Sequence, residues 1–137
     1  VRPDEERSSP MTDDHPSLDK FGRFLMEHFR DHAIDDVDTL LAAGWKAPGV
    51  QALQTELVGF TEEQRAVVRR CLITCVDGAI HAFLFKLQER SDFEDDLQVL
   101  VDGKNVAILS DGIHGEPFGE EGWQARFSKH GQSPDQA

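Results

Sequence analysis

The feature that most constrains the fold is a long run of apolar residues that begins directly after a helix-capping sequence. Thr61 and Gln64 have the spacing of a capping box, in which each side chain accepts a hydrogen bond from the other residue's backbone N–H. Apolar residues then recur every three or four positions as far as Leu87, which predicts a helix of about seven turns. We expect a broad stripe of this helix to be buried: Val67, Val68, Cys71, Leu72, Cys75, Val76, Ala79, Ile80, Phe83, Leu84 and Leu87.

The rest of the chain predicts smaller elements around that helix. Residues 17–41 repeat apolar side chains with the helical period and shift phase near residue 31, so they form one kinked helix or two. A further helix begins near Pro48, because proline favours a first helical turn. The apolar period drops to two over residues 97–109, and Asp102-Gly103 between the two halves predicts a β-hairpin. A short closing helix falls within residues 120–129.

These elements predict an α+β fold that is mainly helical. Three to four helices pack around the long central helix, together with the β-hairpin and the short C-terminal helix. A chain of 137 residues has the size of one domain, and we place that domain at residues 17–130. Residues 1–16 are polar and charged and predict a disordered tail, within which Met11 is an alternative first residue. Residues 131–137 predict a flexible C-terminus.

The cellular location is predicted from the length and composition of the apolar stretches. Residues 1–16 contain no apolar segment of the kind found in signal peptides. The longest apolar run is interrupted by Thr74, Asp77, His81 and Lys86, which is typical of a buried helix and not of a membrane span. We therefore expect a soluble cytoplasmic protein.

The two cysteines are expected to be free thiols. Cys71 and Cys75 are four residues apart, which on a helix separates their Cβ atoms by roughly 5–6 Å. A disulfide needs about 3.8 Å between Cβ atoms, so this pair cannot form one without unwinding the helix. Both lie on the predicted apolar stripe and are expected to be buried there, and no further soft ligand accompanies them for a metal.

The charge balance limits the possible partners. The chain has 26 acidic residues against 14 Lys plus Arg, a formal net charge of −12. Phosphate groups of nucleic acids and anionic membranes are therefore disfavoured as partners. Acidic residues gather at residues 31–38 and again at Asp92, Glu94, Asp95 and Asp96. The second cluster predicts either a surface that binds a basic protein partner or a solvated surface that maintains solubility.

The glycine-rich stretch at residues 110–123 is the first candidate for a chemical site. It contains four glycines, together with Asp111, His114 and Glu116, which are oxygen and nitrogen ligands suited to a divalent metal. The alternative is a turn that leads from the hairpin into the last helix, and we favour this interpretation.

Histidines on the helices are the other candidates. Asp77 and His81 stand one helical turn apart, so the carboxylate could orient the imidazole as a general base. The alternative is the solvent-facing edge of the long helix. His28 and His32 have a zinc-binding spacing but lack a third ligand nearby. Phosphate-binding loops, catalytic triads and cysteine-rich zinc patterns are all missing from the sequence.

In size, acidity and lack of catalytic motifs the chain resembles the broad class of small bacterial toxin-neutralising or immunity proteins. The resemblance is one of general character, and it implies a protein partner with a basic surface and no cofactor. We therefore expect a non-catalytic protein-binding module. One alternative is a small metal-dependent or acid/base enzyme whose site is built from Asp77, His81, Asp111, His114 and Glu116. The other is a homo-oligomer subunit that uses aromatic residues near Trp45 or Trp123.

Overall fold

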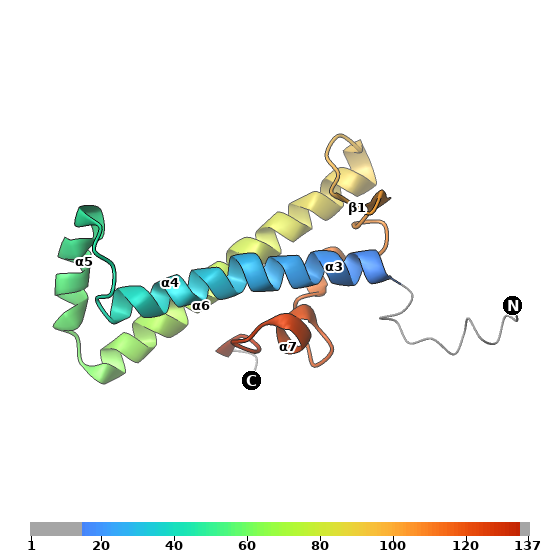
Figure 1. Ribbon diagram of the computed structural model, residues 1–137. Helices are drawn as coiled ribbons and strands as arrows, with labels where there is room; N and C mark the ends of the chain where they lie inside the picture. The colour runs from blue at the N-terminus through green and yellow to red at the C-terminus, as the bar shows by residue number, and fades with distance from the viewer. Residues whose placement is uncertain (1–14, 135–137) are drawn as a thin grey trace, which may run out of the picture.

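Two long helical rods that cross form the frame of the molecule (Figure 1). The computed structural model describes residues 15–134. A shorter helix joins the rods at one end, and the C-terminal segment packs beneath their crossing. The first rod consists of α3 (Pro16–Leu25), the π-helical turn η1 (Met26–Arg30) and α4 (Asp31–Leu41); the joining helix is α5 (Pro48–Val58); the second rod is α6 (Glu62–Glu89) with the π-helical turn η2 (Arg90–Glu94).

The π-helical turn η1 explains the phase shift in the sequence. The wider turn lets both Met26 and Arg30 face the interior, after which α4 continues with Ile34 and Val37 buried. The first rod is therefore continuous from Pro16 to Leu41.

The capping box of α6 is confirmed. The N–H of Thr61 donates to Oε1 of Gln64 at 2.8 Å, and the N–H of Gln64 donates to Oγ1 of Thr61 at 3.1 Å. The mainly helical fold with a small antiparallel hairpin is confirmed as well.

The hairpin is shorter than expected. Its strands are β1 (Leu100–Val101) and β2 (Lys104–Asn105), with Leu100 opposite Asn105 and Val101 opposite Lys104. Asp102 and Gly103 both have positive φ, 52° and 80°, which is the geometry of a two-residue hairpin turn. Beyond β2 the chain bends into successive turns, in which the N–H of Ile108 donates to the carbonyl of Asn105. The strands therefore have two residues each, and one further hydrogen bond, from the N–H of Val106 to the carbonyl of Val99 at 3.1 Å, joins the two sides before the turns.

The main core lies where α3, α6 and the C-terminal segment meet. The helix η3 (Ile113–Gly115) and the helix α7 (Trp123–Phe127) close it. The ring of Trp123 is fully buried and meets Phe21 edge to face at 6.0 Å. A Cβ at Gly22 would lie 2.4 Å from this indole, so glycine is required there. The buried members of this core are Leu18, Phe21, Leu25, Met26, Leu84, Leu87, Val106, Ile113 and Trp123.

The expected buried stripe of α6 is wrong over much of its width. Its buried residues are Ile73, Asp77, Leu84 and Leu87, whereas Phe83 is 46% exposed and Val67 is 54% exposed. Cys71 and Cys75, expected to be buried, are exposed free thiols. The reason is that the described elements packing most extensively on α6, namely α4, η3 and its own continuation η2, do not surround it. The helix is therefore long but not enclosed.

The chain ends also differ from expectation where they are described. Pro16 already belongs to α3, while the rest of the expected N-terminal tail, residues 1–14, lies outside the described residues. Gly131 and Ser133, expected in a flexible C-terminus, are hydrogen bonded to interior side chains. Residues 135–137 lie outside the described part. None of the described helices is long and apolar enough to cross a membrane.

Candidate functional site

Asp77, one of the candidate catalytic residues, is held in a buried ion pair. Nε of Arg30 donates to Oδ1 of Asp77 at 2.6 Å, and the two side chains are 1% and 7% exposed. A second guanidinium nitrogen reaches Oδ2 at 3.2 Å, and the hydroxyl of Ser133 also donates to this oxygen. The carboxylate thus accepts three hydrogen bonds from Arg30 and Ser133, and none of the hydrogen bonds described for it comes from His81.

This ion pair ties the C-terminal segment to the helical rods. Nη1 of Arg30 donates to Oγ of Ser128 at 2.8 Å and to the carbonyl of Gly131 at 2.7 Å. Asp31 accepts hydrogen bonds from Oγ of Ser128 and from the N–H of Lys129. Because a buried charge is strongly unfavourable unless it is paired, these contacts let Arg30 and Asp77 lie in the interior.

Sequence reasoning missed Arg30 and Ser133 as partners of Asp77. Their separations from Asp77 are 47 and 56 residues, so no local pattern connects them. A signal was nevertheless present. Asp77 occupies a core position of α6 in step with Ile73 and Leu84, where an unpaired charge is not tolerated.

The two candidate histidines do come together. The rings of His81 and His114 meet edge to face with their centroids 5.6 Å apart. Phe85 lies 5.2 Å from His114, and Phe118 lies 6.0 Å from His81. Four rings therefore gather where α6 meets the glycine-rich loop. Nδ1 of His114 is a buried atom without a hydrogen-bond partner in the described part of the chain.

The candidate carboxylates do not join these histidines. Glu116 accepts a hydrogen bond from Oγ of Ser110 at 2.6 Å, and Asp111 is exposed. Within residues 15–134, no group of three or more His, Cys, Asp or Glu side chains is placed to hold a metal ion. The structure thus brings together two of the five residues of the proposed enzyme site, His81 and His114.

The glycine-rich loop folds as a corner. The N–H of Trp123 donates to the carbonyl of Glu116 at 2.9 Å, and the N–H of Gln124 donates to the carbonyl of Pro117 at 3.0 Å, so the loop turns back onto the start of α7. Gln88 of α6 holds the other side, because it accepts from the N–H of Ile113 at 2.9 Å and donates to the carbonyl of Ala107 at 3.1 Å.

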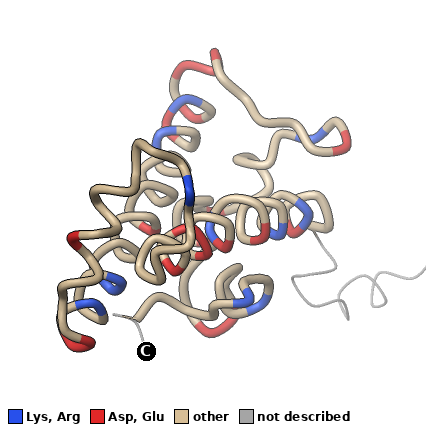
Figure 2. The backbone as a smooth tube through the Cα atoms, turned by 60° about the vertical axis from the view of Figure 1, so that its left-hand side comes forward, with Lys and Arg blue, Asp and Glu red and all other residues tan. Residues whose placement is uncertain are grey.

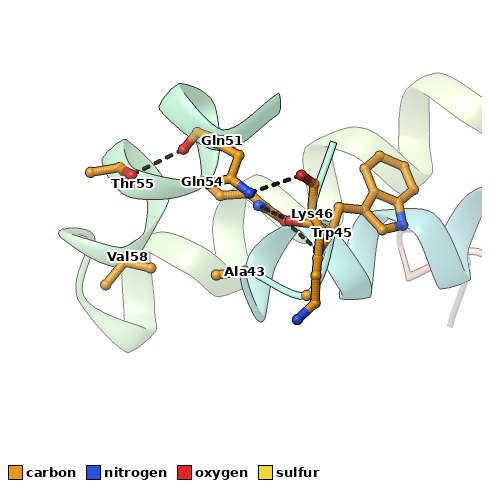
Figure 3. Close-up of a pocket in the computed structure, with 8 residues that line it drawn as sticks. Ala43, Trp45, Lys46, Gln51, Gln54, Thr55 and Val58 are labelled. Carbon is orange, nitrogen blue, oxygen red and sulfur yellow. Dashed lines mark hydrogen bonds between the residues drawn. The ribbon is translucent and has the colours of Figure 1, made fainter. Parts of the chain in front are cut away.

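One pocket has a volume of about 430 Å³ and lies between the α4–α5 connector and α5. Gln54 lines it, and its side chain accepts a hydrogen bond from the N–H of Trp45 at 2.9 Å and donates one to the carbonyl of Trp45 at 2.8 Å (Figure 3). Gln51 donates to the carbonyl of Lys46 at 3.0 Å, whereas Thr55 donates to the carbonyl of Gln51 within α5 at 3.0 Å. Gln54 and Gln51 therefore fix the connector.

A second pocket, of about 340 Å³, lies beside α4 and the C-terminal segment. It contains Asp35, whose pKa is lowered by hydrogen bonds from Lys129 and then from His130. His32 also lines it and stands 3.6 Å from Asp36, whereas His28 packs against the ring of Phe24. Neither pocket includes His81 or His114.

The acidic cluster predicted to bind a partner lies at the far end of α6. In Figure 2 red segments mark this tip, where the chain leaves α6 and turns towards the hairpin. Arg90 stands 3.2 Å from Glu94 and 3.5 Å from Asp96. Asp95 accepts from Gln98 at 2.6 Å, and Asp92 accepts from Gln88 at 3.1 Å.

An exposed aromatic side chain lies within this acidic cluster. Phe93 is 82% exposed, the highest value among the large apolar side chains described as exposed. The segment that follows adds three more exposed apolar residues: Leu97, Leu100 and Ile108. We call residues 92–108 the acidic end. Sequence reasoning found its charges but did not recognise its apolar residues as part of the same surface.

Comparison with protein-family models, with curated proteins and with solved structures found no match for this chain. The proposed function therefore rests on the geometry and chemistry of the chain itself.

Proposed function

We propose that this chain is a non-catalytic protein-binding module whose acidic end binds a partner with a basic surface. The observation that carries the proposal is Phe93, an aromatic side chain 82% exposed among four carboxylates. Aromatic residues supply much of the affinity of protein interfaces, and complementary charge around them supplies association rate and specificity.

The charges of the acidic end remain available to a partner. Residues 90–96 contain one arginine and four carboxylates, a net charge of +1 − 4 = −3. The ion pairs that Arg90 makes with Glu94 and Asp96 are exposed, and exposed pairs contribute little to stability. A basic protein can therefore replace these contacts at a small loss of free energy.

The backbone of the acidic end is fixed in advance of binding. The π-helical turn η2 ends at Asp95, which has a left-handed backbone with φ of 55°. The N–H of Asp95 donates to the carbonyl of Arg90 and closes this turn. A surface that is already ordered loses less conformational entropy on binding.

Composition favours one form of this function. A small acidic protein without catalytic motifs fits a bacterial toxin-neutralising or immunity-type role, in which it covers the basic surface of a toxin in the cytoplasm. The alternative enzyme would need Asp77, Asp111 and Glu116 near the two histidines. Asp77 instead pairs with Arg30, Glu116 accepts from Ser110, and Asp111 is exposed.

Affinity capture from a native lysate tests the proposal. The bait is the whole chain, compared with the variant Asp92→Asn/Glu94→Gln/Asp95→Asn/Asp96→Asn and with Phe93→Ala. Asparagine tolerates the left-handed backbone at residue 95, so the fold of the first variant is preserved.

Glu120→Gln/Glu121→Gln is the control, because it removes two charges elsewhere. We expect wild type and control to capture the same basic protein in a salt-sensitive manner and both acidic-end variants to lose it. Equal capture by all four chains contradicts the proposal.

A further inference from the structure

The outward face of α6 is an apolar surface that no described element covers. We define it as nine exposed residues: Val67, Cys71, Leu72, Cys75, Gly78, Ala79, Ala82, Phe83 and Phe85. Phe85 marks the edge of this face, because its ring also meets His114 of the glycine-rich loop. A helix that is apolar around most of its circumference is normally buried. In this chain the covered side is the one that carries Ile73, Asp77, Leu84 and Leu87. The outward face therefore requires a partner from outside the described chain.

The outward face is also uncharged. On a helical wheel of 100° per residue, Arg69, Arg70 and Asp77 fall on the half that faces α4 and the glycine-rich loop, whereas Arg65 has the same angle as Phe83 and lies just before the face begins at Val67. Arg69 confirms this placement, because its Nε lies 2.6 Å from Oδ1 of Asp38 in α4. At the end of the face, Lys86 and Glu89 pair with each other at 3.1 Å. A basic partner thus finds no carboxylate to bind between Gln64 and Lys86.

The charge of the molecule points to the occupant. Two chains of net charge −12 repel each other over most of their surfaces. They can meet closely only where neither chain presents charge, and the outward face of α6 satisfies this condition for both copies at once. A two-fold contact uses the same patch on each subunit, so one uncharged face is sufficient.

The distribution of side-chain size fits an antiparallel pairing of two copies of α6. Small residues occupy the middle of the face (Cys71, Cys75, Gly78, Ala79 and Ala82). Val67 precedes them, Phe83 and Phe85 follow them, and Leu72 lies along one side. A two-fold axis near Val76 and Asp77 brings the small centres of both copies together, so that the backbones can approach to about 8–10 Å. An added Cβ at Gly78 meets nothing within 4 Å, which leaves the space above the face open for a second helix.

The area of the face is enough for a reversible dimer. The stretch from Val67 to Phe85 is about 28 Å long, and half the circumference of a helix about 11 Å wide gives on the order of 500 Å² per copy. The two copies together bury about 1,000 Å², the lower limit of specific interfaces. An obligate dimer would need more area.

We propose that the outward faces of two copies of this chain pack antiparallel as a homodimer, with Cys75 close to the two-fold axis. This dimer leaves the acidic end free, so it is independent of the partner proposed above. The native thiols Cys71 and Cys75 are exposed on the face and report on the contact directly.

Sedimentation velocity of the whole chain in reducing buffer tests the dimer. We expect wild type to convert from monomer to dimer with concentration in the micromolar range. Ala82→Glu places a charge in the middle of the face and should weaken dimerisation at least tenfold. Ala52→Glu, at an exposed helical alanine of α5 outside the face, should behave as wild type. Far-ultraviolet circular dichroism and thermal melting check that both variants fold.

Mild oxidation gives a second readout. Cys71→Ser retains Cys75 near the axis and should form a disulfide-linked dimer quickly, whereas Cys75→Ser retains a thiol further from the axis and should crosslink more slowly. A wild type that stays monomeric at hundreds of micromolar, or an Ala82→Glu variant that dimerises like wild type, overturns the proposal. Monomeric wild type that instead binds a different protein through this face also overturns it. A quadruple acidic-end variant that dimerises normally but captures no basic partner separates the two proposals.

Discussion

The guanidinium of Arg30 and the carboxylate of Asp77 meet at 2.6 Å in the interior, although the two residues stand 47 positions apart in the chain. One belongs to the first helical rod and the other to the second, so the pair fixes the point at which the rods cross. Ser128, Gly131 and Ser133 complete its hydrogen bonds. The ion pair thereby makes the C-terminal segment part of the fold.

Removal of one member of this pair should strongly destabilise the protein. Arg30→Ala leaves the Asp77 carboxylate buried without its counter-charge, and we expect a loss of about 3–5 kcal/mol in the free energy of unfolding. The double variant Arg30→Met/Asp77→Leu removes both charges and should recover much of this loss. Urea unfolding followed by circular dichroism measures both. A loss below about 1 kcal/mol for Arg30→Ala would show that the pair is not buried as described.

Burial along α6 predicts that two neighbouring residues contribute differently to the free energy of unfolding. Leu84 is fully buried, so Leu84→Ala should lower the free energy of unfolding by about 2–5 kcal/mol. Phe83 is 46% exposed, and Phe83→Ala should have a clearly smaller effect on the monomer. Denaturation at low protein concentration, where the proposed dimer would dissociate, measures the difference. Equal losses for the two variants would place the covered side of α6 elsewhere.

The glycines of the corner differ in what an added side chain would meet. Gly112 has extended backbone, and an added Cβ at Gly115 meets nothing within 4 Å. At Gly122 the Cβ would lie 2.2 Å from the carbonyl oxygen of Phe118. Gly122→Val should therefore destabilise strongly, and Gly115→Val only slightly. Thermal melts of the two variants, measured side by side, decide the order.

Asp35 predicts a specific dependence of stability on pH. Its pKa is lowered in the folded state, chiefly by the hydrogen bond from Lys129 and also by that from His130. A lowered folded pKa stabilises the protein above the ordinary aspartate value of about 3.9, and this contribution disappears as the pH falls through the lower folded value. Asp35→Asn should therefore lose less stability than wild type between about pH 5 and pH 2. Melting temperatures across this range measure the effect, and parallel curves would contradict it.

A metal titration tests the alternative function. Because only His81 and His114 of the five candidate residues lie together, we expect equal melting temperatures with zinc, manganese, magnesium or a chelator. His114→Ala should melt in the same way under all four conditions. A zinc-dependent rise in melting temperature that appears only in wild type would favour the enzyme hypothesis, because a ligand that binds the folded state stabilises it.

Short-range interactions account for the structural elements that could be predicted from the sequence. The capping box of Thr61 and Gln64, the Asp102-Gly103 turn and the closing helix at Trp123 each depend on residues a few positions apart, and all are present in the structure. The mainly helical fold follows from the same kind of information. The acidic cluster at residues 92–96 was also visible, because charge is a property of composition.

The tertiary structure alone decided which side of α6 is covered and what Asp77 contacts. When a helix is apolar around most of its circumference, its sequence does not indicate which side is buried. The positions of α4 and η3 determine that Leu84 is buried and Phe83 exposed. The ion pair of Arg30 and Asp77, the contact of His81 with His114 and the requirement for glycine at residue 22 beside Trp123 likewise join segments that no local pattern links. Such contacts depend on how the elements pack in three dimensions, and the periodicity of one element carries no information about its neighbours.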